Sequence, residues 1–172
     1  ELQIVADGKI AMPGKDIDLD LSFSSPQNAF KRLLSMVPNA YIEGYEDVKA
    51  NGQFQLQGEV KGIYNDTSYP AFELRAAVSD GQVQYPGLPA SINDINARAT
   101  VNSPSSDFDD LVVDVTRFGL SLAGSPFNAS FRLSTPMSDP ALQATAKGKI
   151  VLEDLARAFP MEGVEQLQGL IN

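Results

Sequence analysis

The chain has 172 residues, a formal net charge of −9 and a sequence pI near 4.4. Its 13 lysines and arginines are scattered, whereas nucleic-acid binding needs basic clusters that neutralise phosphates, so we predict no nucleic-acid partner. The acidity also disfavours electrostatic attachment to an anionic bilayer surface. The sequence has no cysteine, histidine or tryptophan. It therefore offers no disulfide framework, no thiolate nucleophile and no histidine as general base or zinc ligand.

The N-terminal segment predicts a β-hairpin followed by a helix. Residues 16–23 alternate between apolar and acidic or hydroxyl side chains, the period-two pattern of a half-buried strand. A strand over residues 2–11 should pair with it through the turn-forming residues 12–15. The Ser25-Pro26 pair supplies an N-cap and a first-turn proline, so a helix is predicted to follow and to end at Pro38.

Strand-like segments dominate the rest of the chain. Alternation begins at Gln53 and continues to Val60, and the next apolar row runs from Phe72 to Val78. Asp80-Gly81 is a turn or bulge signal before a short strand-like run. Further strands are expected over residues 95–101, 111–116, 118–123, 127–134 and 142–152, and a short helix over residues 153–159.

These segments amount to roughly nine or ten strands and two helices. Strands and helices do not alternate regularly, which disfavours a parallel doubly wound sheet. Turns rich in glycine and proline without obvious crossovers favour a meander, and a large open meander should twist and curl. We therefore predict a mainly β fold, a large curved antiparallel meander sheet that forms a groove or half-barrel, with two short α-helices.

The chain is expected to be a single β-rich domain that belongs to a longer protein. It starts within a strand-like pattern, shows no signal peptide and contains no apolar run near the roughly 18 residues of a membrane span. Within residues 1–172 we expect a hairpin plus helix over 1–49, a β-meander over 50–160 and the start of a further strand over 161–172.

A series of motifs resembles a known family. Residues 52–62 read Gly-Gln-Phe-Gln-Leu-Gln-Gly-Glu-Val-Lys-Gly, which is similar to the G-x-h-x-h-x-G-x-h-x-G strand of AsmA-like proteins, where h is an apolar residue. The blocks P-x-F-x-L, V-x-D-G-x-h-x-Y and L-P-x-S-h-x-D-h follow in the family's order at residues 70–74, 78–85 and 88–95. Residues 125–127, 139–140 and 150–155 also fit. The resemblance covers residues 50–160 well and the N-terminal third loosely.

The resemblance implies a periplasmic β-groove protein of the bacterial cell envelope, usually anchored in the inner membrane by a segment that is missing here. AsmA-like members are implicated in phospholipid movement towards the outer membrane and in outer-membrane biogenesis, and they are similar to bridge-like lipid transfer proteins. The implied partners are phospholipid acyl chains, the inner membrane and an envelope protein. No cofactor is implied.

Apolar rows on neighbouring strands form the candidate lipid-contacting face. A groove would hold acyl chains because each CH₂ removed from water contributes about 0.8 kcal/mol. The alternative is a closed core, covered by a second sheet layer or by the helices, in a structural or protein-interaction module of the envelope. The candidate lipid-contacting residues are Phe54, Leu56, Val60, Phe72, Leu74, Ala76, Val78, Phe127, Phe131 and Leu133.

The plentiful acidic residues do not predict a metal or catalytic site. Asp16, Asp18 and Asp20 alternate along a strand, whereas a calcium loop needs turn glycines and converging oxygens. The aspartates of residues 107–114 are expected on a solvated surface. Catalysis needs a nucleophile with a base or two carboxylates at a defined separation, and no spacing singles out such a pair. We predict no metal, no catalytic residues and no enzymatic activity, with a glycan-cleaving carboxylate pair as the remote alternative.

Overall fold

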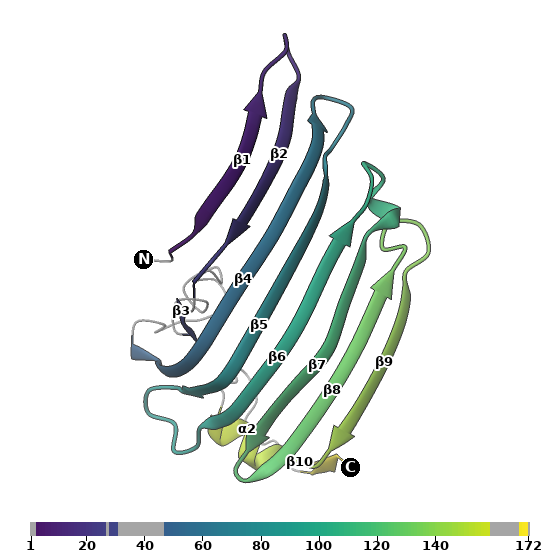
Figure 1. Cartoon of the computed structure of the whole chain (residues 1–172). Helices are drawn as coiled ribbons and strands as arrows, with labels where there is room; N and C mark the ends of the chain where they lie inside the picture. The colour runs from purple at the N-terminus through teal and green to yellow at the C-terminus, as the bar shows by residue number, and fades with distance from the viewer. Residues whose placement is uncertain (1–2, 27, 31–46, 159–168, 172) are drawn as a thin grey trace.

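The computed structural model describes residues 3–26, 28–30, 47–158 and 169–171. Its main sheet is one antiparallel meander in the order β1-β2-β4-β5-β6-β7-β8-β9, and β3 pairs with β4 off this path (Figure 1). This arrangement confirms the predicted mainly β fold. The strands are β1 Val5–Ala11, β2 Ile17–Ser24, β3 Asn28–Ala29, β4 Lys49–Tyr64, β5 Ala71–Gln84, β6 Ile92–Ser103, β7 Val112–Leu122, β8 Ser125–Ser134 and β9 Ala141–Gly148.

The N-terminal hairpin is as predicted, whereas the start of the predicted helix is corrected. β1 and β2 pair antiparallel, and β2 pairs in turn with β4. The Ser25 N–H donates to the Leu56 carbonyl at 2.7 Å, and the Ser25 Oγ accepts the Leu56 N–H at 2.8 Å. β4 engages Ser25 in this way, so the chain first forms β3 at Asn28–Ala29, and helical geometry begins only at Phe30. The rest of the predicted helix, residues 31–38, lies outside the described residues.

A bulge in β5 explains why Val78 and Val83, which are separated by an odd number of positions, face the same side of the sheet. The register between β5 and β6 shifts between Val78 and Gly81, and Asp80 has a positive φ of 51°. A bulge inserts an extra residue and so changes which side chains face which side of the sheet. Val78 before the bulge and Val83 after it therefore pack in the same apolar cluster. The Asp80-Gly81 signal thus marks a bulge within one strand.

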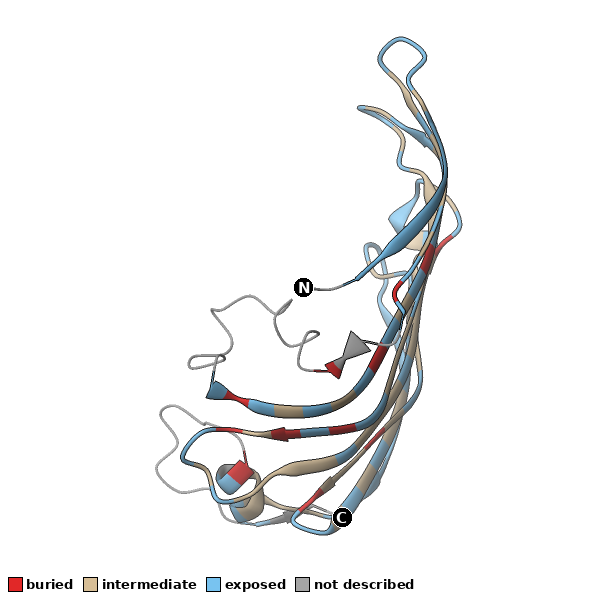
Figure 2. Ribbon diagram, turned by 60° about the vertical axis from the view of Figure 1, so that its left-hand side comes forward, coloured by how far each residue is buried: buried red, intermediate tan, exposed pale blue. Residues whose placement is uncertain are grey.

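A second bulge corrects the prediction of separate strands over residues 111–116 and 118–123. These segments form one strand, β7, in which the pairing with β8 shifts register between Val115 and Phe118 without ending. Bulges bend a strand and increase its twist. The curvature of the sheet in Figure 2 is consistent with these local bends.

Gly52 lies where β4 passes the bulge in β5. Its φ is 113°, and a Cβ there would lie 2.7 Å from the Gly81 Cα and 2.8 Å from the Asp80 carbonyl oxygen. We expect Gly52→Ala to lower the free energy of unfolding by about 2 kcal/mol, as measured by denaturant titration. Gly87→Ala is the control, because Gly87 also has a positive φ, 73°, but its Cβ would meet nothing within 4 Å. Equal losses in both variants would contradict the steric explanation.

The C-terminal strand is shorter than predicted. Of the expected strand over 142–152, β9 ends at Gly148, where φ is 152° and a Cβ would meet the backbone of β8. A separate two-stranded sheet then pairs β10, Ile150–Val151, with β11, Leu170–Ile171. Helix α2, Leu152–Ala158, confirms the predicted short helix. β11 falls in the segment predicted to start a further strand, and residues 161–168 lie outside the described residues.

The two faces of the curved sheet differ in chemistry. In β2 the more buried and the exposed residues alternate strictly, with Ile, Leu and Phe on the more buried side. β3 and α2 lie on the concave side of the sheet (Figure 2). A core cluster of Phe30, Val48, Val83 and Tyr85 packs at one end of this side, and burial raises the pKa of the Tyr85 hydroxyl. Elsewhere the described strands form a single layer.

Candidate functional site

The concave face carries apolar rows that run across the sheet from β4 to β9. Side chains alternate along each strand, so residues that lie opposite one another on paired strands share a face. One row consists of Phe23, Gly58, Leu74, Val101, Val113, Leu133 and Leu142. The next row consists of Leu56, Ala76, Ala99, Val115, Phe131 and Ala144. A third row consists of Phe54, Val78, Ala97, Phe118, Ala129 and Ala146.

The structure brings all the candidate lipid-contacting residues onto this concave face, but it covers two of them. Phe54 is only 2% exposed, and Val78 packs against the core cluster. The others are half-buried, apart from Phe131, which is 38% exposed. We call these others the open apolar face: Leu56, Val60, Phe72, Leu74, Ala76, Phe127, Phe131 and Leu133.

Further residues that the candidate set does not include lie on the same face. They are Leu19, Leu21 and Phe23 of β2, Val101 of β6, and Val113, Val115 and Phe118 of β7. The alternation of apolar and polar residues in β2 could have identified Leu19, Leu21 and Phe23. In β7 a bulge lies between Val115 and Phe118, so alternation alone does not place these two residues on one face. Phe23 and Leu74 close over Gly58, since a Cβ on Gly58 would lie 2.3 Å from the Phe23 Cζ and 2.8 Å from the Leu74 Cδ2.

One end of the sheet is covered. This covered end carries the β5–β6 and β7–β8 connections (Figure 1). The core cluster around Val48 and Val83 packs there, and Leu88 of the β5–β6 connection packs against it. The Ala90 N–H of that connection donates to the Arg157 carbonyl of α2 at 3.2 Å. Side chains and helix α2 therefore close the concave face at this end.

The opposite end, which we call the open end, carries the β1–β2, β4–β5, β6–β7 and β8–β9 connections (Figure 1). Most of the exposed large apolar side chains of the described residues lie there: Ile10, Met12, Ile63, Tyr64, Tyr69, Phe108, Met137 and Leu142. The others are Ile4, Val5 and Phe131. Large apolar side chains are thus mostly exposed at the open end, whereas those of the core cluster are buried at the covered end.

Asp109 joins two connections at the open end. Its Oδ1 accepts the Met137 N–H at 3.1 Å and the Ser138 N–H at 3.0 Å. Hydrogen bonds lower the pKa of the Asp109 carboxyl. The Ser138 side chain has the largest effect, and the backbone N–H groups of Ser138 and Met137 add to it. The β6–β7 connection, including the 3₁₀ helix Phe108–Asp110, therefore holds the β8–β9 turn in place.

The hydrogen bonding of Asp109 to the β8–β9 turn, which we call the Asp109 clamp, should depend on pH. Because its folded-state pKa is lowered, the Asp109 carboxylate stabilises the fold above its unfolded pKa of about 3.9, and the contribution is lost as pH falls through the lower folded value. We expect Asp109→Ala at pH 7 to speed hydrogen exchange of the Met137 and Ser138 amides several-fold. The difference from the wild type should vanish below the folded pKa. Asp66→Ala, in the β4–β5 connection, is the control, and equal exchange in wild type and Asp109→Ala at pH 7 would contradict the clamp.

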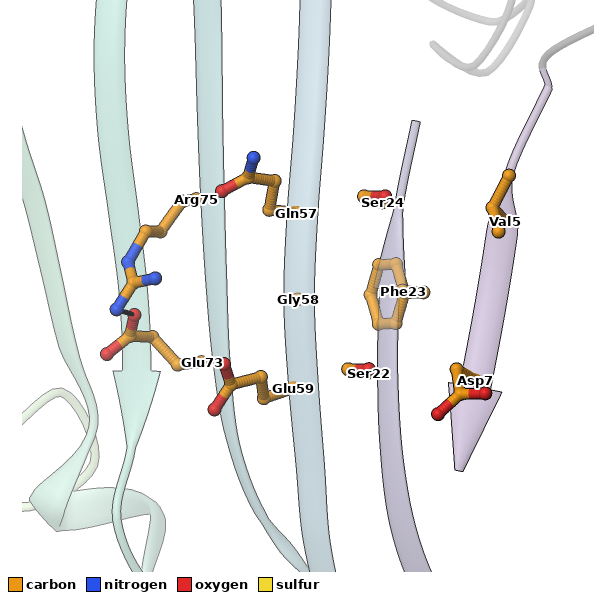
Figure 3. A pocket seen from close by; sticks show the side chains of 10 residues that line it. All are labelled: Val5, Asp7, Ser22, Phe23, Ser24, Gln57, Gly58, Glu59, Glu73 and Arg75. Carbon is orange, nitrogen blue, oxygen red and sulfur yellow. Dashed lines mark ion pairs between the residues drawn. The ribbon is translucent and has the colours of Figure 1, made fainter. Parts of the chain in front are cut away.

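The convex face holds a shallow hollow of about 240 Å³ between β1 and β5 (Figure 3). The carboxylates of Asp7, Glu59 and Glu73 line it, and the Arg75 guanidinium forms an ion pair with Glu73. The hollow opens to solvent, where such pairs contribute about 0–1 kcal/mol. Within the described residues, no three Asp, Glu, His or Cys side chains group closely enough to hold a metal ion.

Cross-strand ion pairs also lie on the convex face. Lys61 pairs with Asp20 at 3.3 Å and Arg132 pairs with Asp114 at 2.9 Å. The members of each pair lie opposite one another on adjacent strands. Opposite charges in this arrangement support the strand register. The aspartates of β2 therefore lie on the solvated face of the sheet, as the sequence predicts.

No family model matches the chain, and no curated protein or solved structure is significantly similar to it. Among the described residues, no helix is both long enough and apolar enough to cross a bilayer.

Proposed function

We propose that this chain is a non-enzymatic segment of a bacterial envelope lipid-transport protein, and that its open apolar face shields phospholipid acyl chains from water. The supporting observation is the set of concave rows that stay apolar from β4 to β9. Most members of these rows are half-buried without a second layer of described strands above them. An acyl chain lying across the rows would cover surface that otherwise meets water.

The mechanism is passive. Each CH₂ group transferred from water to this wall contributes about 0.8 kcal/mol, so a tail is held without a specific polar contact to its headgroup. The headgroup stays in water and no bond changes. An apolar surface that spans several strands on a monomeric domain is typical of an interaction site. The motif resemblance to AsmA-like proteins supports a periplasmic location, an inner-membrane anchor on the parent protein and a role in outer-membrane biogenesis.

Native mass spectrometry with lipid extraction tests the proposal. Protein expressed in the bacterial periplasm and purified without detergent is expected to carry mass additions of phospholipid, which extraction identifies. Added phospholipid is expected to raise the melting temperature, because a ligand that binds only the folded state stabilises it. A clean protein mass together with a melting temperature that phospholipid does not change would contradict the proposal.

Strand β9 favours a second candidate, a protein-interaction module of the envelope. Every residue of β9 is exposed, and β9 ends the path of described strands in the main sheet. An edge strand offers backbone N–H and C=O groups to an added strand of a partner. A photoreactive residue at Thr145 separates the candidates in cells. Strand addition predicts a cross-link to another protein, whereas acyl-chain shielding alone predicts none.

A further inference from the structure

We infer that the open end docks on the surface of a zwitterionic phospholipid bilayer, so that acyl chains pass between the bilayer and the open apolar face at this end. The inference rests on the proposed function and adds to it the surface that meets the membrane and the kind of membrane that this surface fits.

Every connection at the open end presents a large apolar side chain to solvent. We call these four the tip residues: Met12 in β1–β2, Tyr69 in β4–β5, Phe108 in β6–β7 and Met137 in β8–β9. Met12 and Met137 are 72% and 73% exposed. At the covered end the pattern is reversed, since Tyr85 is buried and Leu88 packs against the core cluster. Exposed large apolar side chains are therefore concentrated at the open end, although Ile4 and Val5 are also exposed at the other end of β1.

Contacts between connections hold three of the tip residues, Tyr69, Phe108 and Met137, in a defined arrangement. The Tyr69 ring lies 5.8 Å from the Tyr64 ring and 5.2 Å from the Phe108 ring, measured between centroids. Asp109, next to Phe108, binds the backbone of Met137. Tyrosine rings combine an apolar body with a polar hydroxyl and are enriched where membrane meets water. The end thus presents an ordered apolar edge whose tyrosines suit a bilayer interface.

The carboxylates at the open end favour a zwitterionic lipid surface over an anionic one. Lys15 is the one basic side chain in the four connections, whereas carboxylates recur in all of them: Asp16, Asp66, Asp107, Asp109, Asp110 and Asp139. Anionic lipids attract basic segments and repel acidic ones. The ammonium groups of a zwitterionic lipid surface complement these carboxylates while the tip residues reach the apolar boundary below.

The open end is continuous with the open apolar face, which favours a lipid surface over a protein partner. Tyr64 lies opposite Ile17 on the concave side, and Ile10 and Leu142 lie on the same side where β1 and β9 reach this end. A tail can therefore move from the tip residues to Leu133 without crossing a charged row. An acyl chain is the ligand that has an apolar body long enough to occupy both surfaces.

Vesicle flotation tests the inference with Met12→Ser/Met137→Ser, since substitutions at these exposed positions should leave the fold intact. We expect wild type to float with phosphatidylcholine vesicles and the double variant to partition about tenfold less. Ile4→Ser/Val5→Ser is the matched control, because it removes exposed apolar side chains from the other end of β1 and should float as wild type does. The double variant should still bind a phospholipid with a photoreactive tail.

A second measurement uses the absence of cysteine from the chain. An environment-sensitive fluorophore on Met137→Cys should shift to the blue with phosphatidylcholine vesicles, whereas the same label on Ile4→Cys should not. Equal flotation of wild type and the double variant, no flotation of either, or binding only to anionic vesicles would overturn the inference. Tip-dependent flotation without any tail adduct would support the docking surface and remove the proposed function.

Discussion

Changing Leu56 and Leu74 to aspartate is expected to abolish phospholipid binding while the sheet stays folded. Leu56 lies opposite Ala76 and Leu74 lies opposite Gly58, so the two leucines are diagonal neighbours on the open apolar face. A bound acyl chain would remove the new carboxylates from water, which costs several kcal/mol. In the lipid-free protein they remain solvated. We expect a roughly 100-fold loss of phospholipid occupancy, measured by native mass spectrometry.

The convex face supplies a matched control on the same two strands. Gln55 and Ser79 are exposed there and are also diagonal neighbours, since Gln55 lies opposite Ala77 and Gln53 lies opposite Ser79. Gln55→Asp/Ser79→Asp adds the same charge to the same strands and should leave phospholipid occupancy unchanged. Equal losses in the two double variants would indicate a general effect of charge and contradict a binding role for the concave face.

Changing Phe54 to alanine is expected to be the most destabilising change on the concave face. Phe54 is 2% exposed and lies opposite Val78, which packs against the core cluster. Truncating a buried phenylalanine loses its transfer free energy and leaves a cavity. We expect the free energy of unfolding to fall by about 3 kcal/mol, measured by denaturant titration of lipid-free protein.

Phe131→Ala is the comparison that separates core from ligand surface. Phe131 lies on the same face but is 38% exposed, so its truncation should cost about 1 kcal/mol of stability. Phospholipid binding should show the reverse order, with the larger loss in Phe131→Ala. Equal effects of the two truncations on stability would contradict the division of the concave face into a covered end and an open apolar face.

Where strand pairing is regular, the sequence predicts the structure well. The alternation of residues 16–23 identifies both β2 and its apolar face, because side-chain direction has the same period as the strand. The same is true of the rows through Phe54 in β4 and Phe72 in β5. The rows that cross the sheet needed the structure, since they depend on register, which alternation within one strand does not specify.

Bulges and tertiary pairing account for the corrected elements. Val115 and Phe118 share a face only because a bulge lies between them, and no turn residue marks that bulge in the sequence. Ser25-Pro26 has the composition of a helix start, but hydrogen bonds to Leu56 bring the segment onto β4. The contrast between covered and open ends is likewise tertiary, since it depends on where α2 and Phe30 pack.

The most direct test of the central claim is to map where an acyl chain lies. The purified protein is incubated with phosphatidylcholine that carries a diazirine near the end of one tail, irradiated and analysed by peptide mass spectrometry. The proposal predicts adducts at concave positions such as Leu74, Val101 and Val113, and none at the convex Gln57 and Glu73 that line the hollow in Figure 3. Adducts on the convex face, or adducts spread equally over both faces, would contradict it.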